Sequence, residues 1–203
     1  MALGLTSSLY SKKLNGTLDV VGSEGKLVSN SNLHLGLNLA YSLTSSFRLL
    51  FNYESREIDF DNTEAIIAGE ESFKVDSTRL GVRWIMHPRV ALRFLVTSEE
   101  DLAFNINTSN QAEIYSENIT YFTVYYDQIV FLAETMYSGF RLGYDISASG
   151  ETIEGRSANI FELFAVVGGL EVNYLIKKIT KSNSDLTFEE TDSALNFLYT
   201  LRF

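Results

Sequence analysis

The feature that most constrains the fold is the regular alternation of residues 194–203. Bulky apolar side chains occupy every second position: Leu195, Phe197, Tyr199, Leu201 and Phe203. The positions between them are mostly polar: Asn196, Leu198, Thr200 and Arg202. Successive side chains of a β-strand point to opposite faces, so this pattern predicts a strand with one apolar face. A closed barrel in a membrane would pair both edges of such a strand and surround its apolar face with lipid.

The same period of two recurs along the chain. In residues 33–43 every odd position is apolar, whereas the even positions carry small or polar residues such as His34 and Asn38. Further alternating segments are 47–56, 78–86, 90–96 and 129–147. A membrane-spanning helix needs about 18 consecutive apolar residues, and the apolar runs here are only a few residues long. The sequence therefore excludes spanning helices and predicts strands.

We expect a single domain, residues 1–203, with an all-β fold: an antiparallel transmembrane up-and-down β-barrel of about ten strands. The expected strands are 3–14, 33–43, 47–56, 78–86, 90–96, 118–126, 129–147, 159–167, 170–180 and 194–203. Short turns at 44–46, 87–89, 127–128 and 168–169 alternate with longer loops, which is the connectivity of membrane barrels. Eight strands are the alternative, if the first segment is a loose arm and residues 118–126 pair differently.

The end of the chain resembles the assembly signal of bacterial outer-membrane β-barrel proteins. The residues that carry this resemblance are Phe197, Tyr199, Leu201 and the C-terminal Phe203. The whole length, with its short turns and long loops, resembles the small porin-like barrels of that class. The resemblance implies a location in the bacterial outer membrane, contact with outer-membrane lipid, and insertion by the outer-membrane assembly machinery after transit through the periplasm. Residues 1–6 lack the pattern of a signal peptide, so we expect the sequence to be a mature form.

A soluble barrel of the lipocalin kind would also alternate, but its apolar face would point inward around a ligand. In this sequence the minority face repeatedly carries arginine, glutamate and small residues. The apolar face adds aromatic residues near the strand ends, as in the aromatic girdles of membrane barrels: Tyr41, Tyr53, Trp84, Tyr144 and Tyr174. These features favour the membrane over the soluble alternative.

The formal net charge of −10 argues against a nucleic-acid partner, because binding a phosphate backbone requires a basic surface. We assign the acidic residues of the non-alternating segments to loops: Glu64, Glu70, Glu71, Glu99, Glu100, Asp101, Glu113, Glu117, Asp185, Glu189, Glu190 and Asp192. The chain has no cysteine, which excludes thiolate metal sites and thiol redox chemistry. Residues 59–62 are too short a motif for an EF-hand, so we expect no metal and no cofactor.

A charge network is expected inside the barrel. Its members are Arg48, Arg79, Arg83 and Arg93 from early strands and Glu134, Glu162 and Glu171 from later ones. Buried charges must be paired, so the network can be a plug that stabilises the interior. The alternative is a narrow charged constriction that selects small solutes. Both interpretations predict that Arg79 and Arg83 are intolerant of substitution.

The sequence does not predict an enzyme. Histidine is the most common general base, and the chain has two: His34 on the inward face of a strand and His87 in a turn. Neither has a serine or an acid at the spacing that outer-membrane hydrolases use. We therefore expect His34 to form hydrogen bonds in the lumen.

One segment, residues 159–167, is apolar on both faces. Its large side chains are candidates for contact with lipid or with another protomer: Phe161, Leu163, Phe164, Val166 and Val167. Ordinary packing near a barrel end is the alternative. The sequence thus supports a structural or porin-like barrel with a narrow or plugged lumen, and alternatively a homo-oligomeric porin-like ring that holds lipid or another hydrophobic ligand.

Overall fold

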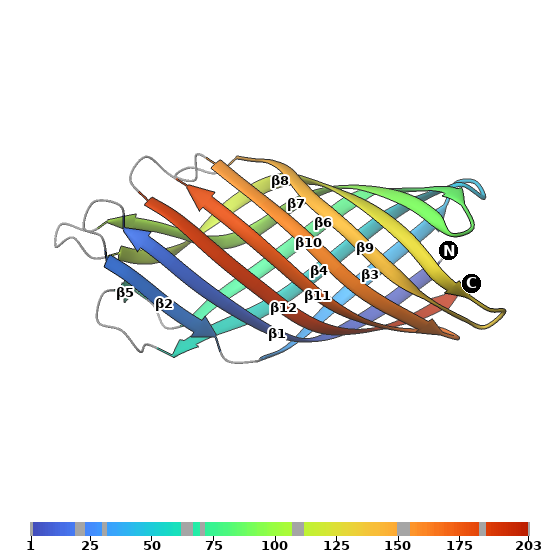
Figure 1. Ribbon diagram of the computed structural model, residues 1–203. Helices are drawn as coiled ribbons and strands as arrows, with labels where there is room; N and C mark the ends of the chain where they lie inside the picture. Colours follow the sequence, from blue (N-terminus) through green and yellow to red (C-terminus); the bar gives the residue numbers. More distant parts are fainter. Residues whose placement is uncertain are drawn as a thin grey trace.

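In the described part of the chain, ten long antiparallel strands close into one barrel (Figure 1). The computed structural model describes residues 2–18, 23–29, 32–61, 67–69, 72–106, 112–149, 155–182 and 186–202. Within these ranges no helix is long and apolar enough to cross a membrane. The expected all-β class and the expected ten-stranded barrel are confirmed, and the eight-stranded alternative is wrong.

The strand segments are β1 (Ala2–Leu18), β2 (Ser23–Ser29), β3 (Asn32–Ser42), β4 (Phe47–Asp61), β5 (Ile67–Gly69), β6 (Ser72–His87), β7 (Val90–Ile106), β8 (Ala112–Leu132), β9 (Met136–Ser149), β10 (Gly155–Val167), β11 (Leu170–Ser182) and β12 (Leu186–Arg202). β2 and β3 pair with the second and first halves of β1, so together they form one strand of the barrel. The short β5 pairs with β8 outside the order of the ring. The remaining segments each form one barrel strand.

The ring closes between β1 and β12. These two strands pair without a break from Ala2–Arg202 to Leu18–Leu186. β12 also pairs with β11, so the alternating strand at the end of the chain has a partner on both edges, as its pattern predicts. Phe197, Tyr199 and Leu201 lie exposed on the outer face of β12, and Phe203 lies outside the described residues.

The outer face of the barrel is apolar and the inner face is polar. The aromatic residues expected near strand ends are all outside, with exposed fractions between 39% for Trp84 and 57% for Tyr41. The ring of Trp84 stacks on Phe47 with 6.0 Å between the centroids. Charged side chains are buried inside instead. A soluble barrel with an apolar interior is therefore excluded, and the outer face is that of a barrel surrounded by lipid.

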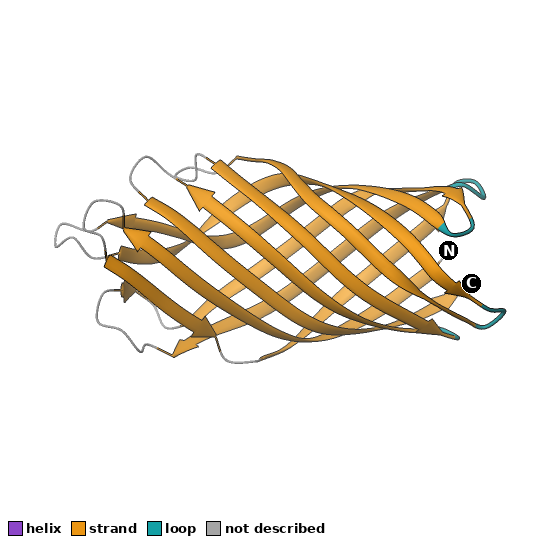
Figure 2. Cartoon of the chain, viewed as in Figure 1, coloured by secondary structure: helices purple, strands orange, loops and turns teal. Residues whose placement is uncertain are grey.

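The short turns gather at the end of the barrel where both chain termini lie (Figure 2). They join β3 to β4 at 43–46, β6 to β7 at 88–89, β8 to β9 at 133–135, and β10 to β11 at 168–169. In the last of them Gly168 has a φ of 60°, a conformation that favours glycine. Three of the four turns lie where the sequence predicts them.

The predicted turn at 127–128 is wrong, because β8 continues through these residues to Leu132. Asp127 resembles a turn residue in the sequence, but its side chain points into the barrel and is 1% exposed. Two arginines on a neighbouring pair of strands neutralise it there. The turn at 133–135 consequently contains Glu134, which is exposed and outside the lumen, so the assignment of Glu134 to the lumen network is also wrong.

The assignment of the acidic residues to loops is wrong for most of those that the structure describes. β7, β8 and β12 extend beyond the apolar band of the outer face, and they carry buried acidic side chains: Glu99, Asp101, Glu117, Glu190 and Asp192. Glu100, Glu113 and Glu189 are also on strands. Glu64, Glu70, Glu71 and Asp185 lie outside the described residues. In this part of the barrel both faces are polar, so the alternation that marks a strand in the sequence disappears.

Candidate functional site

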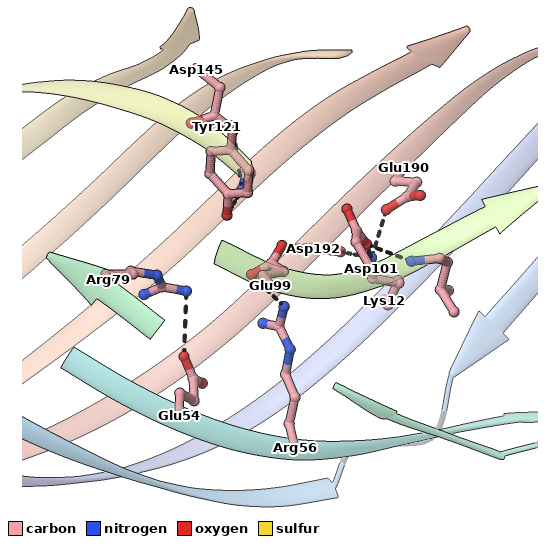
Figure 3. Close-up of polar contacts among 12 residues, drawn as sticks. Lys12, Glu54, Arg56, Arg79, Glu99, Asp101, Tyr121, Asp145, Glu190 and Asp192 are labelled. Carbon is pink, nitrogen blue, oxygen red and sulfur yellow. Dashed lines mark hydrogen bonds and ion pairs between the residues drawn. The ribbon is translucent and has the colours of Figure 1, made fainter. Parts of the chain in front are cut away.

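The lumen contains two clusters of charged side chains, one near each end of the barrel. The mouth cluster lies on the long-loop side and consists of Lys12, Asp101, Asp145, Arg156, Lys181, Glu190 and Asp192. The base cluster lies on the short-turn side and consists of Arg48, Arg83, Arg93, Asp127, Arg141, Glu162 and Glu171. Between them Arg79 pairs with Glu54 at 3.5 Å (Figure 3).

In the mouth cluster, two lysines on the strands that flank β12 share the same acidic partners. Lys12 Nζ on β1 lies 2.6 Å from Glu190 Oε2, 3.5 Å from Asp101 Oδ1 and 3.6 Å from Asp192 Oδ1. Lys181 Nζ on β11 lies 2.6 Å from Glu190 Oε1 and 2.7 Å from Asp101 Oδ2. Figure 3 shows the Lys12 contacts converging on one point of the lumen. The lysines and acids therefore compensate one another away from water.

Asp101 reaches this cluster from the opposite wall. Three strands separate β7 from β1 in one direction around the ring, and three separate it from β11 in the other. Asp101 nevertheless contacts lysines of both β1 and β11, and Arg156 Nε of β10 at 3.6 Å. The main-chain carbonyl of Leu102 also accepts a hydrogen bond of 2.8 Å from Lys181 Nζ. Side chains thus meet across the full width of the lumen at this level.

Aromatic rings fill the space beside the mouth cluster. The guanidinium of Arg156 lies 3.8 Å from the centroid of the Tyr121 ring, and Lys177 Nζ lies 4.7 Å from the same ring. Arg156 also pairs with Asp145, which Lys177 contacts at 3.3 Å. Cations that stack on a ring and pair with an acid are held in place on two sides. This layer leaves little free volume beneath the mouth cluster.

The base cluster is built around Arg141 and Asp127. Arg141 on β9 pairs with Glu162, and with Glu171 at 2.7 Å, and its guanidinium lies 4.1 Å from the centroid of the Phe164 ring. The carboxylate of Asp127 lies 3.1 Å from an Nη of Arg83 and 2.8 Å from Nε of Arg93.

A series of cavities runs through the lumen from the short-turn end. A cavity of about 200 Å³ at that end is bordered by Arg48, Arg83 and the turn residues Gly168 and Gly169. A second of about 160 Å³ shares Arg141 and other lining residues with the first. A third of about 70 Å³ ends below Asp192. These three cavities decrease in size toward the mouth cluster, whose side chains are between 1% and 6% exposed.

Six of the seven predicted lumen residues lie in the lumen: Arg48, Arg79, Arg83, Arg93, Glu162 and Glu171. The structure does not place their arginines and glutamates in two facing groups, because Asp127 and Arg141 connect them. The sequence did not reveal the mouth cluster. A signal exists in retrospect, since its members continue the inward positions of recognised strands, as Glu190 and Asp192 do for β12.

The doubly apolar segment of β10 divides between the two faces. Phe161, Leu163 and Val167 are exposed on the outer face, where contact with lipid or a protomer is open to them. Phe164 and Val166 are buried inside the barrel, so their assignment to such a contact surface is wrong. The physical reason is that Phe164 supplies the ring beneath Arg141, which gives the interior an apolar side chain with a polar partner.

The histidines occupy different environments. His34 is buried in the lumen, with its ring centroid 5.3 Å from that of Tyr10 in an edge-on arrangement. His87 is exposed at the end of β6, and its Nδ1 accepts a hydrogen bond of 3.2 Å from the main-chain amide of Arg89. Among the described residues no group of three or more His, Cys, Asp or Glu side chains is arranged to hold a metal ion.

No protein-family profile and no curated protein matches the sequence. Among solved structures, the β-domain of the Bordetella autotransporter BrkA is 10% identical over 100% of both chains, with a TM-score of 0.48. An outer-membrane channel from Pseudomonas putida F1 is 12% identical over 98% of this chain and 95% of that one, also with a TM-score of 0.48. The outer-membrane protease OmpT from Escherichia coli is 9% identical over 98% and 96%, with a TM-score of 0.46. At such low identity the likeness concerns the shape of the chain and not its activity.

Proposed function

We propose that this protein is an integral outer-membrane β-barrel whose lumen is closed on the long-loop side, so that it does not conduct ions in this conformation. One observation carries the proposal: Lys12, Lys181, Asp101 and Glu190 meet across the lumen and are each no more than 2% exposed. Long side chains without contact to water leave no aqueous path between them. Of the two interpretations of the charged lumen, this arrangement supports the plug.

The apolar outer face and the position of the turns support the outer membrane as the location. Barrels of that membrane have short periplasmic turns, longer extracellular loops and a lipid-facing apolar band. The short turns and both termini lie together in this chain (Figure 2), which makes the base cluster periplasmic and the mouth cluster extracellular. Outer-membrane lipid and the outer-membrane assembly machinery are accordingly its proposed partners.

A lipid-holding oligomeric ring lacks a specific observation in its favour. The doubly apolar segment that suggested it has its inner residues packed in the lumen, as Phe164 is against Arg141. The remaining exposed residues on β10 belong to an apolar face that continues onto β9 and β11 through Leu142 and Tyr174. Ordinary membrane lipid suffices to cover such a face.

We also propose that the barrel is not an enzyme. A general base has to lie within hydrogen-bonding reach of its substrate. His34 is 2% exposed between Tyr10 and the barrel wall, and His87 is held by its own turn. The buried carboxylates of both clusters pair with arginine or lysine, which makes them counter-ions and not candidate nucleophiles.

Conductance in a planar lipid bilayer tests the closed lumen. We expect the refolded wild-type barrel to insert without ion-conducting steps. A variant with Lys12, Asp101, Lys181 and Glu190 all replaced by alanine removes two cations and two anions, so the net charge of the lumen is unchanged. We expect this variant to show stepwise conductance, because the volume that these side chains fill becomes available to water.

The matched control replaces four exposed residues at the same end of the barrel and leaves the mouth cluster intact. Two cations and two anions at exposed positions are suited to it: Lys13, Lys178, Glu57 and Glu189. We expect the control to remain silent. Regular conductance steps from the wild-type protein at low voltage would show that the lumen is open and that the proposal is wrong.

A further inference from the structure

The arginines of the base cluster form a row across three adjacent strands. Arg48 on β4 is directly opposite Arg83 on β6, and Arg83 is directly opposite Arg93 on β7. Like charges at directly opposed positions of a sheet repel one another and destabilise it. An uninterrupted row of three such residues on the inner face therefore requires compensation by negative charge.

The carboxylates of the base cluster compensate this row incompletely. Asp127 pairs with both Arg83 and Arg93, at 3.1 and 2.8 Å. Glu162 and Glu171 are engaged by Arg141. Among the described residues no carboxylate lies within ion-pair distance of Arg48, and its buried Nε has no hydrogen-bond partner. The cluster thus holds four guanidiniums against three carboxylates, and the uncompensated cation is Arg48.

The unpaired guanidinium borders a space that a ligand can enter. Arg48, Arg83, Arg93 and Arg141 all line the cavity of about 200 Å³ at the short-turn end, together with Asn38 and Asn52, whose side-chain amides are hydrogen-bonded to each other. Amide and guanidinium groups are hydrogen-bond donors, and the planar fork of arginine matches the oxygens of a carboxylate or a phosphate. A small oxyanion would fit both the donors and the missing charge.

We propose that this cavity is a binding site for a small oxyanion, a carboxylate or a phosphate, which enters from the short-turn side and is held by Arg48 with Arg83. The site goes beyond the closed lumen proposed above and does not depend on it, because the cavity lies on the opposite side of the lumen from the mouth cluster. A barrel that conducts ions would refute the closure and leave this inference standing.

Isothermal titration of the barrel refolded in a zwitterionic detergent tests the site. Inorganic phosphate and acetate are titrated separately at constant ionic strength, with chloride as the background anion, so that the two arms distinguish the classes of oxyanion. We expect saturable binding of at least one of them. Arg48→Gln should raise its Kd about tenfold or more, the effect of losing a charge-assisted hydrogen bond.

Lys178→Gln is the matched control, because Lys178 is exposed on β11 at the opposite end of the barrel from the cavity. Its Kd should stay within about twofold of the wild type, since it contributes only distant, screened charge. Arg48→Lys keeps the charge and loses the planar fork, so an intermediate Kd is expected. It also replaces Arg48→Gln as the test if that variant does not fold.

The outcomes that overturn the inference are equally definite. Absence of saturable binding for both phosphate and acetate would exclude the site. An equal loss of affinity in Arg48→Gln and Lys178→Gln would show that the barrel attracts anions by its overall field, without a defined site at Arg48.

Discussion

Asp101 is the residue on which the mouth cluster is centred. Its carboxylate contacts Lys12, Arg156 and Lys181, and it is the cluster member that comes from the opposite wall. Buried ion pairs add little net stability compared with apolar residues, but removing one partner leaves the others charged and uncompensated. The effect of Asp101 on the stability of the barrel is therefore expected mainly when its carboxylate is removed.

We expect Asp101→Asn to lower the free energy of unfolding by about 3 kcal/mol, because it leaves buried cations short of one counter-ion. Urea unfolding in lipid vesicles measures this, with the fluorescence of Trp84 as the signal, since it is the single tryptophan of the chain. The control is Asp76→Asn, which breaks an exposed 3.1 Å pair with Lys74 and should cost less than about 1 kcal/mol. Similar small losses for both variants would contradict the central position of Asp101.

At the scale of the strand, the sequence predicts the elements well wherever one face meets lipid. β3 is an example: apolar residues alternate strictly with small or polar ones along it, and the structure exposes Leu33, Leu35 and Tyr41 on the outer face. The contrast between lipid and lumen produces that pattern. The same contrast identifies Arg48, Arg83 and Arg93 as inward residues, because each lies between two outward apolar positions, and Arg79 follows from its place two residues before Gly81 and four before Arg83 on the same face.

The strand pattern is lost where the environment is polar on both faces. Along β7 the outward Ser98 and Glu100 alternate with the buried Glu99 and Asp101, so that nothing in the sequence distinguishes inside from outside. The mouth cluster lies in this zone, so the alternation of the sequence does not predict it. The wrong prediction of a turn at Asp127 has a related cause. An isolated acid beside glutamine is as typical of a turn as of a lumen that contains arginines.

The outer face of β10 provides a test of the lipid-facing assignment. Leu163 is 49% exposed in the apolar band, beside Phe140 and Tyr174 of the neighbouring strands. We expect Leu163→Lys to destabilise the barrel in lipid vesicles by about 2–4 kcal/mol, the cost of a lysine facing the middle of a bilayer. The same urea unfolding assay measures it.

The matched control is Ser157→Lys on the outer face of the same strand, where Ser157 is opposite Thr180 and outside the apolar band. It should cost no more than about 1 kcal/mol, as for a cation near the membrane interface. If the two lysines had equal effects, the outer face of β10 would not lie against lipid.

At the scale of the whole molecule, the barrel is asymmetric along its axis. Cavities at the short-turn end have volumes of about 220 and 200 Å³, whereas the cavity beneath the mouth cluster has about 70 Å³. Side chains from β1, β7, β10, β11 and β12 then meet in the lumen. Under the proposed closure, the lumen is a pocket that opens on the short-turn side, and its arginine-rich part faces the compartment that we propose to be the periplasm.

Side-specific labelling of a lumen cysteine is the most direct test of whether the lumen is closed on the long-loop side. Leu198 lines the cavities of about 200 and 160 Å³, and the chain has no cysteine of its own, so Leu198→Cys introduces a single reporter. In vesicles of known barrel orientation, we predict that a small membrane-impermeant thiol reagent modifies this cysteine from the short-turn side and not from the long-loop side. The four-alanine variant of the mouth cluster should permit modification from both sides. Rapid modification of Leu198→Cys from the long-loop side in an otherwise wild-type barrel would contradict the closed lumen.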